Sequence, residues 1–154
     1  MVKHDPIPLK QTETKPYYNI VKYLSNKYNK DEKLIQEYVN IVIRETTKYN
    51  IDPLLVLAMI ETESGFNSRA YNQSGAMGLM QVIPRYHPDL ITQEHQSLYD
   101  PNMGINVGVA VLVKFIQKHN GNFVKAINNY GGDSSGNYYK TIYRHLQEIE
   151  QHDI

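Results

Sequence analysis

The feature that most restricts the fold is an apolar run, PLLVLAMI, from Pro53 to Ile60. Asp52 precedes the run as a helix N-cap, and Pro53 takes the first helical position, where its missing N–H costs nothing. The polar residues ETES follow before Gly65 can end the helix. A helix that is apolar on every side is buried among other helices. The sequence therefore predicts a central helix whose C-terminal end carries polar chemistry.

The rest of the chain predicts further helices, because apolar residues recur at helical spacing and nothing reads as a pair of β-strands. A short apolar segment between Gly75 and Pro84 is expected to form one or two helical turns, and residues 85–99 a long surface loop. The prediction is an all-α fold. The expected helices are Pro16 to Tyr28, a second that follows the cap Asp31 and fades at KYN, a third that follows the cap Asp100, the segment NFVKAINNY, and a last helix with a stripe from Tyr139 to Ile149.

The length of 154 residues suits one compact domain. Residues 1–15 mix Pro, Thr, Lys and Gln without periodicity, which predicts a flexible N-terminal arm. Residues 16–154 are expected to form the single domain, including a helical extension over 16–49. Helical periodicity in the extension favours packing on the core over contact with a partner.

Composition excludes several classes of function. Sixteen basic residues balance sixteen acidic ones, so the net charge gives no reason to expect a nucleic-acid partner. There is no cysteine for a disulfide, a thiolate nucleophile or a metal site. The six histidines are scattered singly as solvated residues, with His87 the partial exception in the long loop, so neither a metal nor a cofactor is expected. No stretch is long and uncharged enough to span a membrane.

Two carboxylates, Glu61 and Glu63, lie at the end of the central helix. Two positions apart on a helix, their side chains point about 200° from each other, so they cannot act as a pair on one face. At most one faces the core, where loss of solvent raises the pKa of a carboxyl group and keeps it protonated near neutral pH. Cleavage of a glycosidic bond requires a proton donor of this kind.

The stretch ETESGFNSRAYNQSGAMGLMQVIP resembles the Glu-Ser and Gly-Leu-Met-Gln motifs of the soluble lytic transglycosylase domain, a family of enzymes that cut peptidoglycan. DPNMGINVGVAVL is similar to the Asp-Pro helix of this family, and AINNYGG to its Ala-Tyr-Asn-x-Gly segment. The resemblance covers roughly residues 50–146. It implies a lysozyme-like helical domain with a substrate groove, here with extra N-terminal helices.

The resemblance implies that Glu63, directly before Ser64, is the catalytic acid, and that Glu61 takes a variable, exposed position. Glu63 would protonate the oxygen between N-acetylmuramic acid and N-acetylglucosamine, then as carboxylate withdraw the proton of the muramic acid 6-hydroxyl. That hydroxyl attacks the anomeric carbon of its own sugar, which yields a 1,6-anhydro ring. The substrate thus supplies the nucleophile that a second carboxylate would otherwise provide.

The same resemblance implies the substrate contacts. Ser64 would bind substrate or Glu63, with a structural role at the helix end as the equal alternative. Gly75, Ala76 and Gly78 would let glycan approach the backbone. The expected substrate-binding residues are Ser64, Gly78, Leu79, Met80, Gln81, Asn129, Tyr130 and Tyr138.

Individual roles follow from the matching positions. Gln81 would bind an N-acetyl group, and for Met80 core packing is nearly as good a reading. Tyr130 resembles the tyrosine that hydrogen-bonds the catalytic Glu, although Gly131 stands where the family has Asn, and that departure leaves the role of Asn129 open. Tyr138 or Tyr139 resembles the late tyrosine that closes the groove.

Two other functions stay open. A goose-type hydrolytic lysozyme would need a carboxylate about 6.5 to 9.5 Å from the acid to activate water, and Asp89 and Glu94 in the long loop are the candidates. A glycan-binding or assembly module that has lost turnover is the second alternative.

The expected partner is the glycan strand of peptidoglycan, and the protein is expected to act as a monomer on the cell wall or in the periplasm. The N-terminus has no apolar run that could serve as the core of a signal peptide. This favours a phage-encoded enzyme, in the host cytoplasm or the phage particle, over a trimmed periplasmic enzyme that serves a secretion apparatus.

Overall fold

The computed structural model describes residues 15–91 and 97–153, and within them the chain is helical, with no strand. Two isolated β-bridges join Tyr71 to Met77 and Met77 to Val82. The all-α prediction is confirmed, whereas the expected arm over 1–15 lies, apart from Lys15, outside the described residues. The elements are α1 (Tyr18–Tyr28), α2 (Glu32–Thr47), α3 (Pro53–Ser64), the 3₁₀ helix η2 (Pro84–Tyr86), α4 (Pro101–Lys118), α5 (Phe123–Tyr130) and α6 (Asn137–Glu150).

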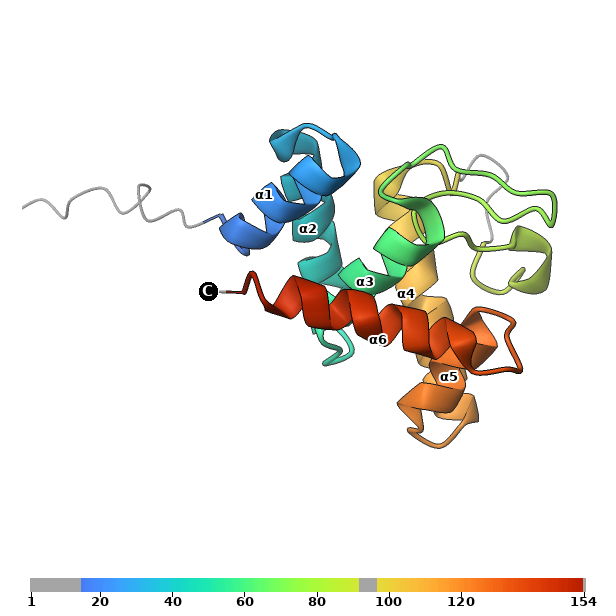
Figure 1. Ribbon diagram of the computed structural model, residues 1–154. Helices are drawn as coiled ribbons and strands as arrows, with labels where there is room; N and C mark the ends of the chain where they lie inside the picture. Colours follow the sequence, from blue (N-terminus) through green and yellow to red (C-terminus); the bar gives the residue numbers. More distant parts are fainter. Residues whose placement is uncertain (1–14, 92–96, 154) are drawn as a thin grey trace, which may run out of the picture.

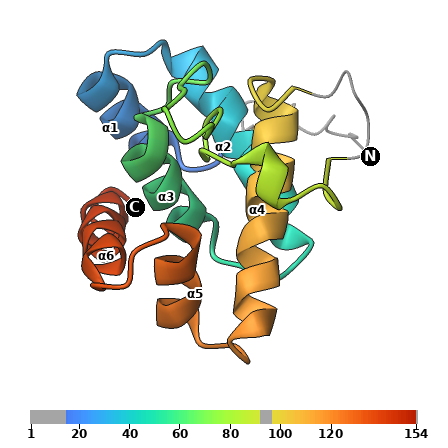
Figure 2. The same cartoon turned by 90° about the vertical axis from the view of Figure 1, so that its right-hand side faces the viewer.

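Helix α3 lies in the middle of the other helices, as Figure 1 and Figure 2 show from two sides. Every residue from Leu54 to Glu61 is buried, which contributes about 1.5 to 3 kcal/mol for each large apolar side chain. Asp52 caps the helix, because its Oδ1 accepts a hydrogen bond from the N–H of Leu54 at 2.9 Å. Gly65 ends it with a φ of 56°. The central helix is therefore confirmed, and its polar end points toward the segment that leads to α4.

The helical extension packs on the core. Ile20, Val21 and Leu24 of α1 are fully buried in the cluster that also holds α3. Helix α2 contacts α1, α3 and α4, so the extension covers one side of the central helix. Asp31 caps α2 as expected, accepting a hydrogen bond from the N–H of Lys33 at 2.7 Å.

The apolar segment after Gly75 is not helical, contrary to prediction. Gly78 and Gln81 have φ angles of 82° and 51°, a left-handed backbone that breaks a right-handed helix. The segment instead folds back on itself through the bridges at Met77. Its apolar side chains still reach the core: Met80 packs against Gly108 of α4, where any Cβ would overlap the Met80 side chain.

The long loop over 85–99 is only partly a surface loop. Its first residues form η2, and the structure does not describe residues 92–96. His87 and Leu98 are buried, at 9% and 3% exposure. The loop therefore contributes to the core of the lobe on the right of Figure 1, next to the polar end of α3.

Candidate active site

Glu63 lies in the last turn of α3 and is half-buried. The hydroxyl of Tyr138 donates a hydrogen bond to its Oε2. Burial raises the pKa of Glu63 to about 7, and the bond from Tyr138, which favours the charged form, offsets part of that rise. Near neutral pH this carboxyl group is thus present in both protonation states, as a group that gives and then takes a proton requires.

Tyr138 is held in place by the loop before α6. Its N–H binds Oδ2 of Asp133 at 2.7 Å. Its ring lies directly against Gly131, where any Cβ would overlap the ring atoms. Gly131 therefore makes room for the tyrosine that binds Glu63. The Tyr139 side chain lies elsewhere, because its ring stacks on that of Tyr143 with 6.0 Å between the centroids.

The expected role of Tyr130 is corrected by the structure. Its hydroxyl donates a hydrogen bond to the carbonyl of Met80 at 2.6 Å, and Tyr138 takes the bond to Glu63. Burial raises the pKa of Tyr130 well above its ordinary value, and the charge of Glu63 raises it further. Tyr130 therefore ties the end of α5 to the segment behind the carboxylate.

The residues expected to line a groove after α3 face the core instead. Leu79 and Met80 are 1% and 0% exposed. The place of a side chain at Gly78 is taken by the carbonyl of Leu98, so the close approach there is made by the chain and not by glycan. Ser64 donates to the carbonyl of Leu79 at 2.8 Å, which supports its structural alternative. These residues form the wall behind Glu63.

A cavity of about 540 Å³ adjoins this wall. Tyr130 connects the two, because it lines the cavity and binds the Met80 carbonyl of the wall, and Gly131, also in the lining, abuts Tyr138. Gln81 lines the cavity as well, but its Nε2 donates to the carbonyls of Ala70 at 3.0 Å and Gly78 at 2.9 Å. The lining residues are Gln81, Val82, Ile83, Tyr86, His87, Val111, Lys114, Phe115, Lys118, Asn129, Tyr130, Gly131 and Gly132.

Asn129 is the remaining residue that the sequence singled out. Its side chain lines the cavity, and its Oδ1 lies 2.9 Å from Nε2 of His119. The structure thus brings together Glu63 with Tyr138, and Gln81 with Asn129 and Tyr130, at two ends of one region. Of these residues, Tyr138 is the one that binds the Glu63 carboxyl group directly, which is the contact that orients an acid.

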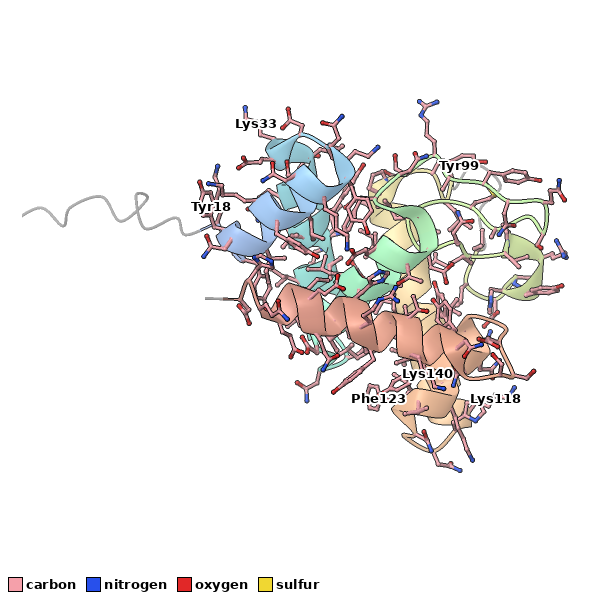
Figure 3. All side chains as sticks on the ribbon, viewed as in Figure 1. Tyr18, Lys33, Tyr99, Lys118, Phe123 and Lys140 are labelled. Carbon is pink, nitrogen blue, oxygen red and sulfur yellow. The ribbon has the colours of Figure 1, made fainter. Side chains whose placement is uncertain are left out.

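One wall of the cavity was missed by the sequence reasoning. Val111, Lys114, Phe115 and Lys118 lie one helical turn apart on α4, and this spacing is the signal that could have found them. Figure 3 shows Lys118 at the outer edge of the molecule, near the turn from α4 to α5. This face of α4 carries the two lysines of the cavity lining, Lys114 and Lys118.

Lys114 is paired with a candidate base of the long loop. Its Nζ lies 3.2 Å from both carboxylate oxygens of Asp89 and 3.5 Å from Nδ1 of His87. The hydrogen bond from Lys114 lowers the pKa of Asp89. Burial and then the charge of Lys114 lower the pKa of His87. The other candidate base, Glu94, lies outside the described residues.

Glu61 is buried, although the sequence resemblance implied exposure. It is 4% exposed, and its Oε2 accepts hydrogen bonds from Nζ of Lys27 at 2.5 Å and from the hydroxyl of Tyr28 at 2.6 Å. The partners come from α1, more than thirty residues upstream, so nothing near Glu61 in the sequence pointed to them.

The described part of the chain contains neither a cluster of metal-ligating side chains nor a helix long and apolar enough to span a bilayer. Residues 15–91 and 97–153 contain no group of three or more His, Cys, Asp or Glu side chains that could hold a metal ion. None of the helices in those ranges combines the length and apolar character needed to cross a bilayer.

Comparison with known proteins adds the family. A sequence model of the family described as Transglycosylase SLT domain matches residues 40–148, and the chain therefore belongs to this family. The match begins within α2 and leaves α1 outside.

Among solved structures, the chain is similar to one described as the complex of the 70-kDa soluble lytic transglycosylase with bulgecin A, with a TM-score of 0.57 and 19% identity. The match covers 89% of this chain and 26% of that chain. This likeness shows a shared lysozyme-like fold, and the present chain spans about a quarter of the larger protein's length.

Proposed function

We propose that this domain is a peptidoglycan lytic transglycosylase in which Glu63 is the catalytic acid. The observation that carries the proposal is a half-buried carboxyl group with a pKa raised to about 7, held by Tyr138, whose ring abuts the cavity-lining residue Gly131. Membership of the SLT domain family supports the reaction class. The solved structure with the same fold belongs to a protein described as a soluble lytic transglycosylase.

The chemistry needs two proton transfers through one group. Protonated Glu63 gives its proton to the oxygen that links N-acetylmuramic acid to N-acetylglucosamine, and the bond from the anomeric carbon to that oxygen breaks. The Glu63 carboxylate then takes the proton of the muramic acid 6-hydroxyl, while the oxygen of that hydroxyl forms a bond to the anomeric carbon. The products are an N-acetylglucosamine end with a free hydroxyl and a 1,6-anhydro ring, and Glu63 regains its proton.

The cavity is suited to a sugar unit. Its volume of about 540 Å³ falls within the range of about 300 to 1,000 Å³ that is common for ligand sites. The aromatic side chains of Tyr86, Phe115 and Tyr130 line it, and such rings pack well on the faces of sugars. Gln81 and Asn129 add amide groups at the same cavity for hydroxyl and N-acetyl groups.

Hydrolysis as in a goose-type lysozyme would require a carboxylate that activates water. Asp89 is engaged by Lys114, at 3.2 Å to each of its oxygens. An internal nucleophile removes the need for such a base, so the paired state of Asp89 favours the transglycosylase. Action on the cell wall follows from this substrate. The proposal includes a monomeric enzyme that serves either a phage particle or a secretion apparatus.

The test is mass spectrometry of the products released from purified peptidoglycan. Wild type should release anhydro-muramic products, and Glu63→Gln should release none while keeping its helical circular dichroism. Glu37→Gln, the same change at an exposed position of α2, is the matched control and should act as wild type. Products with reducing ends would assign hydrolysis, and no release by wild type would favour a glycan-binding module.

A further inference from the structure

The last turn of α3 is held from several sides. The end of a helix lacks part of its internal hydrogen bonding and frays unless other groups hold it. Here four consecutive residues each have a partner elsewhere in the fold. Glu61 binds Lys27 and Tyr28 of α1, Thr62 lies 2.7 Å from Nδ1 of His145 of α6, Glu63 binds Tyr138 of α6, and Ser64 binds the carbonyl of Leu79.

The contact with α1 is the most deeply buried of these. The side chain of Glu61 has no exposed surface, and its second oxygen, Oε1, has no hydrogen-bond partner within the described residues. Both donors, Lys27 and Tyr28, therefore act on Oε2. Lys27 also reaches Oε2 of Glu148 at 3.3 Å, so it links α1 to α6 as well as to α3.

Tyr28 extends the same contact past the end of the helix. A Cβ on Gly65, which ends α3, would lie 3.3 Å from the Tyr28 ring. The ring centroids of Tyr28 and Phe66 are 5.7 Å apart, and Phe66 in turn stacks on Tyr38 of α2 at 6.5 Å. Gly65 and Phe66, the two residues that follow the last turn of α3, are thus fixed against the helical extension.

We infer that Lys27 and Tyr28 are positioning residues for Glu63, acting through Glu61 and the last turn of α3. The inference rests on the proposed function of Glu63. Helix α1 lies outside the residues that match the family model, so the contact that holds the catalytic turn comes from beyond the matched segment. An error of about 1 Å in the place of a catalytic group can cost about 100-fold in rate, so a fixed helix end matters for turnover.

A positioning role for Lys27 can be distinguished from a role in fold stability alone. Lys27→Met leaves the Glu61 carboxylate buried without its cation, which lowers stability on either view. The double variant Lys27→Met with Glu61→Gln has no unpaired buried charge, so its melting temperature should recover, whereas the contact that Lys27 makes from α1 to α3 stays lost. Positioning predicts that kcat remains low in the double variant, and a structural role predicts that kcat recovers together with stability.

The experiment measures three quantities on the full chain: melting temperature, kcat and KM on purified peptidoglycan, and amide hydrogen exchange at residues 62–65. Lys27→Met and the double variant should each lose about tenfold in kcat with KM within twofold, and exchange at 62–65 should be faster in both. Tyr28→Phe removes one hydroxyl and should lose about threefold in kcat. Each variant removes one of the two donors that hold residue 61 from α1, which is why exchange at 62–65 should become faster in all three.

Glu45→Gln is the matched control. Glu45 is a buried carboxylate bound to Lys48 and Arg44, and it lies between α2 and α4 away from the catalytic turn. The variant should lower the melting temperature and leave kcat unchanged. Unchanged exchange at 62–65, or recovery of kcat in the double variant, would overturn the inference. If wild type releases nothing from peptidoglycan, the proposed function fails, and the exchange rates still decide whether α1 fixes this turn.

Discussion

Glu63 at the end of α3 and Glu45 between α2 and α4 are both withdrawn from solvent, but their pKa values shift in opposite directions. Burial raises the pKa of Glu63 to about 7, and one hydrogen bond from Tyr138 offsets part of the rise. Burial also raises the pKa of Glu45, but hydrogen bonds from Lys48, Asn106 and Arg44 outweigh it, and the net pKa is lowered. Glu45 receives these bonds at 2.8 Å from Lys48, 2.8 Å from Asn106 and 3.1 Å from Arg44.

The difference shows what makes a carboxyl group a useful acid. Shielding alone does not, because both groups are shielded. Glu45 meets two cations and an amide, which hold it in the charged form as part of the scaffold. Glu63 meets a single neutral hydroxyl, so its proton can leave and return near neutral pH. The number and charge of the donors decides between structure and chemistry.

The largest expected difference between the two sites is in catalysis. Glu63→Gln should lower kcat/KM by about 1,000-fold, because a general acid contributes about 100-fold to 10,000-fold. Glu45→Gln should keep kcat/KM within about twofold, since it touches no part of the cavity wall. Turbidity of a peptidoglycan suspension over time measures both. Equal losses in the two variants would mean that Glu63 acts only through stability.

The same two substitutions should change stability in opposite directions at pH 8. The pKa of Glu63 is raised from 4.5 to about 7 on folding, so its contribution to stability is complete below about pH 4.5 and is lost as pH rises through 7. Removing the charge should therefore stabilise the fold at pH 8, by at most about 3 kcal/mol.

Glu45, with a lowered pKa, contributes stability above its ordinary pKa of 4.5 that is lost as pH falls through its folded value. Glu45→Gln should destabilise the fold at pH 8 by about 1 to 3 kcal/mol. Urea unfolding at pH 4 and pH 8 measures both variants. A destabilised Glu63→Gln at pH 8 would contradict the contrast.

A smaller effect tests the one donor at Glu63. The hydrogen bond from Tyr138 lowers the pKa of Glu63, so Tyr138→Phe should raise it and move the alkaline limb of the pH–rate profile above 7. Loss of orientation should also lower kcat by about tenfold. Tyr139→Phe is the control, because the Tyr139 ring stacks on Tyr143 and not on the acid, and its profile should match wild type. A shift of the alkaline limb to lower pH in Tyr138→Phe would refute the conclusion that this hydrogen bond lowers the pKa of Glu63.

The smallest expected effect concerns the second carboxylate that hydrolysis would need. Asp89→Asn should change kcat by less than about threefold, because Asp89 is exposed and paired with Lys114 rather than free to activate water. Product analysis should still find anhydro-muramic ends. A loss comparable to that of Glu63→Gln would return the assignment to a hydrolase.

The sequence predicted the parts of this fold that depend on local rules. Caps at Asp31, Asp52 and Asp100 and the apolar run after Pro53 were sufficient to place the helices, because capping and periodicity act within a few residues. The segment after Gly75 was misassigned as helical, since its apolar residues reach the core from a left-handed turn rather than from a helix face.

The site was predicted where chemistry is local and missed where it is not. The end of a buried helix pointed to Glu61 and Glu63 alike, and the resemblance to the Glu-Ser motif selected Glu63. The exchange of roles between Tyr130 and Tyr138 depends on how α5 and α6 meet, and the burial of Glu61 depends on a cation 34 residues away in the chain. Such distant contacts leave no spacing signal in a single sequence.

The glycine at position 131 has a consequence for how related sequences are compared. Its missing side chain is the space that the Tyr138 ring fills, so the identity of one residue in α5's final cap decides which tyrosine reaches the acid. A relative with Asn at this position has no such space. We expect its acid to be held by a group other than the first-turn tyrosine of α6, so residue 131 and the partner of the acid should vary together.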